Sequence, residues 1–225
     1  MISPSPVPAF ETMTIVCAHP DDETFGLGAL VTAFVDAGTR VELICLTAGE
    51  HSTLGAGDGL ATRRSDELLC AAEILGIAGV TLHHYPDGSL AGVPVHELAE
   101  EVATAASHTH ALLTYDHGGI TGHPDHQHAT DVAIAAGRHL GVPVLGWALT
   151  AHVAEQLRAE FDAPFVGRDD RDLDLAITVD RSRQHTAMTC HDSQLQSNPV
   201  PHRRIELQGA LEHLRELHVP DHDSR

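Results

Sequence analysis

The chain has 225 residues, of which 42% are hydrophobic, and this composition suits one globular domain with a sizeable core. Thirty-two acidic and 13 basic residues give a formal net charge of −19, which repels phosphate backbones and anionic lipid and argues against binding to nucleic acid or a membrane surface. All 13 basic residues are arginine, so Schiff-base chemistry and a Walker-type phosphate loop, which need lysine, are excluded.

Pro4, Pro6 and Pro8 deny the N-terminal segment a helix, so residues 1–12 are expected to form an extended arm. Beyond it, short apolar runs alternate with stretches of helical apolar spacing. The expected strands cover residues 13–17, 40–47, 80–84, 111–115, 142–149 and 173–179. The expected helices cover residues 24–37, a stretch that ends at Leu75 before Gly76, and residues 95–106, 124–139 and 203–218.

This alternation predicts a Rossmann-like three-layer α/β sandwich with a mostly parallel sheet, as a single domain over residues 1–225. No apolar stretch approaches the roughly 18 residues that span a bilayer. The N-terminal segment lacks the basic flank and apolar centre of a signal peptide, so a cytoplasmic location is expected. The four cysteines have no C-x-x-C spacing, and we expect small buried hydrophobic residues rather than disulfides.

The first candidate site is the sequence Ala-His-Pro-Asp-Asp-Glu at residues 18–23, directly after the first expected strand. Ligands of open α/β sheets bind beyond the carboxyl ends of the strands. His19 and Asp22 are three residues apart across a turn stiffened by Pro20, so they can point into one space, where a metal ion would satisfy both. Taken alone, the motif is equally compatible with a helix start in which Asp22 is the cap and Glu23 favours the helix dipole.

The second candidate site is Gly-His-Pro-Asp-His at residues 122–126, after the fourth expected strand. Pro124 suits the first position of a helix, so His123 and His126 share one face. A lone histidine in a chain with 19 of them would be interpreted as a surface residue, but two at a strand-to-helix junction favour a site.

Together the two motifs supply two imidazoles and one carboxylate, which is the ligand class of an open catalytic Zn²⁺ site. The set His19, Asp22 and His126 leaves Asp21 and His123 as an acid–base pair beside the metal. The spacing alone does not tell Asp21 from Asp22. Fe²⁺ can compete with Zn²⁺ for such ligands.

These motifs resemble the PIG-L/LmbE-like family of zinc-dependent N-deacetylases. The resemblance covers residues 13–195 and includes two weaker motifs, Arg64-x-x-Glu67-Leu68 and His191-x-Ser193-Gln194. It implies the fold predicted above and hydrolysis of an N-acyl amide.

By this resemblance His19, Asp22 and His126 would be the metal ligands, Asp21 the general base and His123 the general acid. Arg64 and Asp87 would contact the substrate. Apart from the resemblance, Asp125 is expected either to orient His123 or raise its pKa, or only to favour the N-terminus of the helix.

The expected substrate is an N-acetylated amino sugar or its glycoside, cleaved by metal-activated water. The main alternative is an amidase that acts on a thiol conjugate or another non-sugar amide. A metal-free nucleotide-binding module and a metal-storage protein are the rivals from other classes, and each predicts a different metal content. Trp147 and the apolar stripe of the last helix are expected to serve the core or a homo-oligomer contact.

Overall fold

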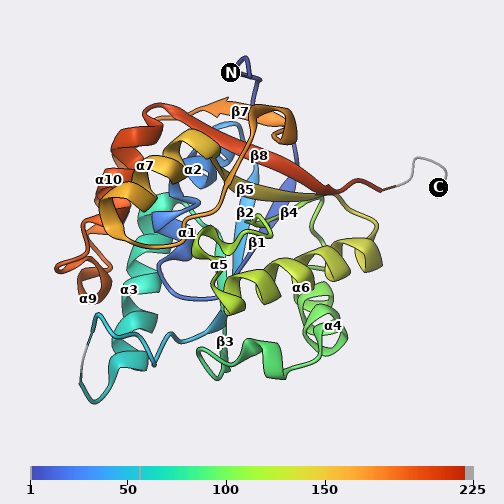
Figure 1. Cartoon of the computed structure of the whole chain (residues 1–225). Coiled ribbons are helices and arrows are strands. Elements are labelled where there is room, and N and C mark those ends of the chain that lie inside the picture. Colours follow the sequence, from blue (N-terminus) through green and yellow to red (C-terminus); the bar gives the residue numbers. More distant parts are fainter. Residues whose placement is uncertain (1, 56, 221–225) are drawn as a thin grey trace.

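The computed structural model describes residues 2–55 and 57–220 and shows a mixed α/β architecture with a mostly parallel central sheet flanked by helices (Figure 1). This confirms the predicted fold class. In the described ranges, no helix is both long enough and apolar enough to cross a membrane.

The eight strands found in the described residues form one sheet in the order β3-β2-β1-β4-β5-β8-β7, with β6 paired to β5. Five neighbouring strands of the sheet, β3, β2, β1, β4 and β5, run parallel to one another. Strand β8 is antiparallel to both β5 and β7. Their bounds are β1 Thr12–Cys17, β2 Arg40–Thr47, β3 Gly79–Tyr85, β4 Leu112–Tyr115, β5 Val144–Thr150, β6 Gly167–Arg168, β7 Leu175–Thr178 and β8 Leu211–His218.

The helices cover both faces of this sheet (Figure 1). Their bounds are α1 Asp22–Phe25, α2 Gly28–Asp36, α3 Leu60–Leu75, α4 Val95–Ala105, α5 Gly119–Gly122, α6 Pro124–Leu140, α7 Ala151–Phe161, α8 Ser182–Met188, α9 Asp192–Leu195 and α10 Val200–Gln208. Two short 3₁₀ helices lie at Leu90–Gly92 and Asp170–Asp172.

Neighbouring residues of β1 contribute to two separate cores because successive side chains of a strand point to opposite faces. Ile15 packs in the core that includes Phe34 of α2. Val16 packs in the other core, with Leu98 of α4 and Val132 of α6. Both faces of the sheet are therefore buried, which explains the nearly continuous apolar run of this strand.

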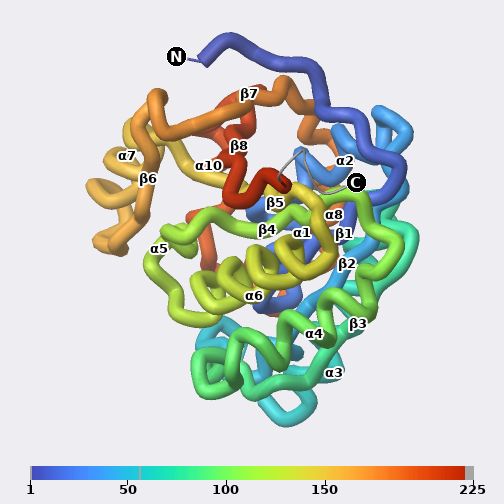
Figure 2. The backbone as a smooth tube through the Cα atoms, turned by 90° about the vertical axis from the view of Figure 1, so that its right-hand side faces the viewer, coloured from blue at the N-terminus to red at the C-terminus, as the bar shows by residue number. Residues whose placement is uncertain are grey.

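Ser5 pairs with Ile177, so the N-terminal arm runs beside β7 (Figure 2). The expected helix over residues 24–37 is instead two helices, because the chain breaks at Gly26 between α1 and α2. A Cβ at Gly26 would collide with the ring of Tyr115. Glycine at this position therefore lets the chain pass close to the end of β4.

The prediction of one helix over residues 203–218 is wrong, because α10 ends at Gln208 and β8 follows. Gly209 ends the helix with φ 61° and ψ −133°, a conformation that favours glycine. Leu211, Leu214 and Leu217 have helical spacing, but in the strand Leu214 enters one core while Leu217 packs against the other. Because apolar side chains of β8 point to both faces of the sheet, the strand shows no strict apolar alternation.

The prediction that the chain has no disulfide is also wrong. Cys70 of α3 is bonded to Cys190, which follows α8, and the two Cα atoms are 5.9 Å apart. Cys17 and Cys45 are free and buried, as expected for small hydrophobic residues. The bonded pair is separated by 120 residues, so no local spacing indicated it.

Candidate metal centre and active site

The two histidine motifs meet because the strands that precede them are neighbours. Strands β1 and β4 pair in parallel, with Thr14 opposite Leu112, so their carboxyl ends lie at the same edge of the sheet. His19 follows β1 directly, and Asp22 begins α1. The short α5 then brings the chain from β4 to His126 in the first turn of α6.

The three predicted metal ligands form one cluster. His19 Nδ1 and His126 Nε2 are 3.1 Å apart, and Asp22 Oδ1 is 3.1 Å from His126 Nε2. Asp22 Oδ2 lies 3.7 Å from His19 Nδ1. Ligand atoms held about 2.0–2.1 Å from one Zn²⁺ in tetrahedral geometry would be roughly 3.3 Å apart, so these side chains fit a divalent cation.

The carboxylate of Asp22 is fixed from behind by the backbone of the first motif. Its Oδ2 accepts hydrogen bonds from the N–H groups of Ala18 and His19, at 3.1 and 2.9 Å. Burial would raise the pKa of Asp22, but His126 and His19 outweigh it and hold that pKa well below its usual range. Asp22 is therefore an anion whose Oδ1 faces the imidazole of His126.

The second ring nitrogen of His19 faces two further carboxylates. His19 Nε2 is 3.1 Å from Asp87 Oδ1 and 3.4 Å from Asp125 Oδ2. Burial would lower the pKa of His19, but these two acceptors raise it to about 11. A carboxylate on one ring nitrogen orients a histidine so that the other nitrogen is offered to a metal, and metal binding would displace the proton from that nitrogen.

Asp21 lies beside this cluster in a constrained backbone conformation. Its φ is 126°, which is unusual for a residue other than glycine. Its N–H donates to Glu23 Oε2 at 2.9 Å, and its Oδ2 accepts from Arg64 Nη2 at 3.0 Å. Burial raises the pKa of Asp21 to about 6, against the opposing charge of Arg64.

Arg64 is 3% exposed and is held by several acceptors. Besides Asp21, its guanidinium donates to the carbonyl of Gly49 at 2.7 Å and to that of Pro20. Gly49 has φ 63°, and a side chain there would collide with Arg64. This geometry favours a positioning role for Arg64, which holds Asp21 in place. It favours that role more than the substrate contact that the family resemblance implies for Arg64.

His123 caps α6 and stands at the open side of the cluster. Its Nδ1 accepts the N–H of Asp125 at 3.2 Å, which leaves Nε2 as the donor atom of the neutral ring. The ring centroid lies 4.9 Å from those of His19 and His126. Burial lowers the pKa of His123, and the neighbouring His126 and His19 lower it further.

The carboxylate of Asp125 faces His19 rather than His123, although its charge opposes the lowering of the pKa of His123. It accepts the N–H groups of Gly88 and Leu90, at 2.7 and 3.2 Å, and faces His19. Its contact with His123 is made by its backbone N–H. Asp87 also accepts the N–H of His51 at 2.9 Å. Asp87 lies in the loop after β3 and Asp125 accepts N–H groups of that loop, so both carboxylates connect the loop to His19.

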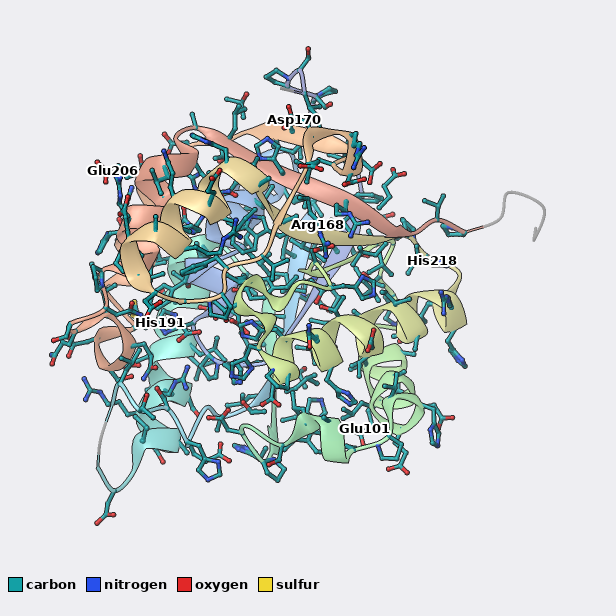
Figure 3. The ribbon with its side chains drawn as sticks, in the orientation of Figure 1. Glu101, Arg168, Asp170, His191, Glu206 and His218 are labelled. Atoms are coloured by element: carbon teal, nitrogen blue, oxygen red, sulfur yellow. A yellow bond between two sulfur atoms is a disulfide. The ribbon has the colours of Figure 1, made fainter. Side chains whose placement is uncertain are left out.

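Glu23 and Glu67 are functional candidates that sequence reasoning did not single out. Glu23 is fully buried, and its Oε1 lies 2.7 Å from Nε2 of His191. His191, labelled in Figure 3, directly precedes α9. Burial would lower the pKa of His191, but the charge of Glu23 outweighs it and raises that pKa. Glu67 accepts the N–H and the hydroxyl of Ser193, at 2.9 and 2.6 Å. The weaker Arg64 and His191 motifs were the signals for these contacts.

The fold of this chain is similar to that of two solved deacetylases. The structure of N,N'-diacetylchitobiose deacetylase from Pyrococcus horikoshii has a TM-score of 0.68 at 18% identity, and the match covers 97% of this chain and 90% of that one. The zinc-inhibited form of teicoplanin deacetylase has a TM-score of 0.69 at 19% identity, with 95% and 100% covered.

A family model described as PIG-L, GlcNAc-PI de-N-acetylase, matches residues 14–137, and the chain belongs to this family. A 1D-myo-inositol 2-acetamido-2-deoxy-alpha-D-glucopyranoside deacetylase from Mycolicibacterium vanbaalenii is 32% identical over 237 residues, which cover 83% of this chain and 82% of the relative. A protein of the same name from Kineococcus radiotolerans is 37% identical over 81 residues, but the match spans only 33% of this chain and 22% of that relative.

Proposed function

We propose that this chain is a metal-dependent N-deacylase that hydrolyses the amide of an N-acyl amino sugar. The observation that carries the proposal is the gathering of His19 Nδ1, Asp22 and His126 Nε2 around one point, with Asp21 and His123 beside them. The amino sugar is inferred from the names of the relatives, which include a diacetylchitobiose deacetylase from Thermococcus kodakarensis, 34% identical over 89 residues (38% of this chain and 33% of that protein).

His19, Asp22 and His126 would hold Zn²⁺ or Fe²⁺. When bound, such a cation supplies Lewis acidity toward the amide carbonyl and activates water. Asp125 and Asp87 keep the ring of His19 in place through its Nε2.

Asp21 is the proton acceptor in this proposal. Two contacts fix the position of Asp21: its carboxylate accepts from Arg64, and its N–H donates to Glu23. The raised pKa of Asp21, about 6, suits a base that works near neutral pH. His123 would act in its protonated, imidazolium form and pass the Nε2 proton to the leaving nitrogen, which leaves a neutral ring whose Nδ1 accepts the N–H of Asp125. Its lowered pKa makes it a stronger acid, and the proton that Asp21 takes from water balances the one that His123 gives.

The metal-storage alternative predicts several ion sites. In the part of the chain that the structure describes, both candidate ligand groups include His19, so they belong to one centre. This favours a single catalytic ion.

A cytoplasmic location belongs to the proposal as well, although the Cys70–Cys190 bond is typical of oxidising compartments.

The test is a screen for released amine with N-acetyl amino sugars, their glycosides and non-sugar N-acyl amides, on protein stripped with a chelator and reloaded. Zn²⁺ is added from below to above one equivalent, because the teicoplanin deacetylase structure is named as a zinc-inhibited form, and Fe²⁺ is added in parallel. Activity on the sugars that vanishes on stripping and returns on reloading supports the proposal. Activity on the non-sugar amides alone would support the alternative amidase, and unchanged activity after complete stripping would contradict the metal centre.

A further inference from the structure

An apolar cavity of about 320 Å³ opens beside the candidate metal centre. It extends the site from Tyr115 at the end of β4 toward Trp147 of β5 and the first turns of α10. Asp21, Asp22 and His126 form part of its wall, so its contents would lie against the reacting amide. It is called the acyl cavity below.

Most of the acyl cavity is lined by carbon. Four aromatic rings contribute to its wall, from Phe25, Tyr115, Trp147 and Phe165. The last three are at most 5% exposed, so they form a fixed surface on the core rather than a loose patch. Aromatic and apolar walls with a few polar groups at one end are typical of sites for small apolar ligands.

The position of His123 decides which half of the substrate this cavity receives. His123 is absent from its wall, although His126 lines it. The leaving nitrogen has to approach the group that protonates it. The other substituent of the carbonyl, which is the acyl chain, then points away from His123 and toward the acyl cavity.

The volume of the cavity exceeds what an acetyl group needs. Water occupies about 30 Å³ per molecule in the liquid, so the cavity is roughly ten water volumes in size. An acetyl methyl group fills only about one such volume and would leave the aromatic walls facing solvent. An acyl group with roughly six to eight carbons would cover them.

We propose that the acyl cavity binds the acyl chain of the substrate and that this enzyme removes apolar acyl groups larger than acetyl. This inference rests on the proposed N-deacylase function and specifies its acyl substrate. The recognition is by apolar burial, and each methylene that enters the cavity is expected to raise kcat/KM about fourfold until the cavity is full.

The experiment uses the metal-loaded full chain and N-acyl glucosamines with acetyl, butanoyl, hexanoyl, octanoyl and phenylacetyl groups. Amine release is measured for each, and a rise in kcat/KM from acetyl to hexanoyl supports the inference. A fall along this series, with acetyl as the best substrate, would overturn the inference and leave the deacylase function intact. Absence of amine release from every member would instead contradict the proposed function.

A variant pair tests whether the cavity is responsible. Ala163 lines the cavity, and Ala163→Phe would fill part of it. We expect the ratio of kcat/KM for octanoyl over acetyl substrate to fall at least tenfold, because roughly two methylenes lose their place. Ala159→Phe, on the exposed surface of α7, is the matched control and should keep the wild-type ratio.

A second series decides between the two halves of the substrate. Acetyl is kept constant and the glycosidic group of the amino sugar is lengthened from methyl to octyl. If this series gains in kcat/KM and Ala163→Phe abolishes the gain, the cavity receives the amine side and the inference is wrong. Circular dichroism and thermal unfolding of both variants establish that they fold.

Discussion

His191 and Glu23 are 168 residues apart in the chain, yet their side chains meet in the fully buried interior with 2.7 Å between Nε2 and Oε1. Glu23 also accepts the N–H of Asp21. Through Glu23, His191 in the C-terminal part of the chain therefore helps to hold Asp21, the residue proposed as the base.

Replacing His191 by alanine would leave the Glu23 carboxylate buried without its cationic partner. We expect a loss of about 3–5 kcal/mol in the free energy of unfolding, measured by urea denaturation. His191→Gln keeps an N–H donor and should recover part of this loss. His185→Ala, at an exposed position in α8, is the control and should change stability by less than about 0.5 kcal/mol. Equal effects of His191→Ala and His185→Ala would mean that the buried pair contributes nothing.

Asp21→Asn removes the proposed proton acceptor and keeps its shape. We expect the metal content to stay at the wild-type level while kcat falls by about 10²–10⁴-fold. Metal is measured by elemental analysis and turnover by amine release. Asp66→Asn, on the exposed side of α3, controls for the loss of one charge. Loss of the metal in Asp21→Asn would show that Asp21, rather than Asp22, is the ligand.

Arg64→Lys distinguishes a positioning role from a substrate contact. Lysine keeps the charge but loses the planar group that reaches both Asp21 and Gly49. If Arg64 positions Asp21, kcat should fall roughly tenfold or more with little change in KM, because misplacement of a catalytic group affects the chemical step. If Arg64 binds substrate hydroxyl groups, KM should rise instead. Arg63→Lys, whose side chain is 50% exposed, should alter neither constant.

Asp116 links β4 to β6 and β8, because its carboxylate pairs with Arg168 at 2.6 Å and also with Arg215. Burial would raise the pKa of Asp116, but the two guanidinium groups lower it below its ordinary value of 3.8. A carboxyl with a lowered folded-state pKa stabilises the protein above the ordinary value, and this contribution is lost as the pH falls through the folded-state pKa.

We therefore expect Asp116→Asn to lower the free energy of unfolding at pH 7 by about 1–2 kcal/mol. The difference from the wild type should shrink as the pH falls below about 4. Denaturation at several pH values measures it, with the exposed Asp131→Asn as the control. A difference that is constant from pH 7 to pH 3 would contradict the role of the carboxylate charge.

The disulfide makes a separate prediction about thiols. The unreduced protein, unfolded in denaturant, should expose two reactive thiols, from Cys17 and Cys45, and four after reduction. Reduction or Cys70→Ser is expected to cost about 2–5 kcal/mol of stability, because a long loop of chain is no longer closed. Four reactive thiols before reduction would show that Cys70 and Cys190 are not bonded.

The sequence by itself determined the α/β fold class with a mostly parallel sheet, six of the eight strands of the described residues and the candidate residues at the strand ends. These follow from local rules, since the apolar period separates strands from helices and the two histidine motifs lie within six and five residues. Even so, the leucine spacing of residues 211–217 led to the wrong element, because β8 directs Leu214 to one core and Leu217 to the other and so shows no apolar alternation.

Only the tertiary structure decided which distant groups meet. The contact of His191 with Glu23, the Cys70–Cys190 bond and the place of Arg64 behind Asp21 all join segments that are far apart in the chain. The direction of Asp125 toward His19, rather than His123, depends on the loop after β3, which supplies its donors. Such pairings depend on packing between elements, which carries no periodic signal in the sequence.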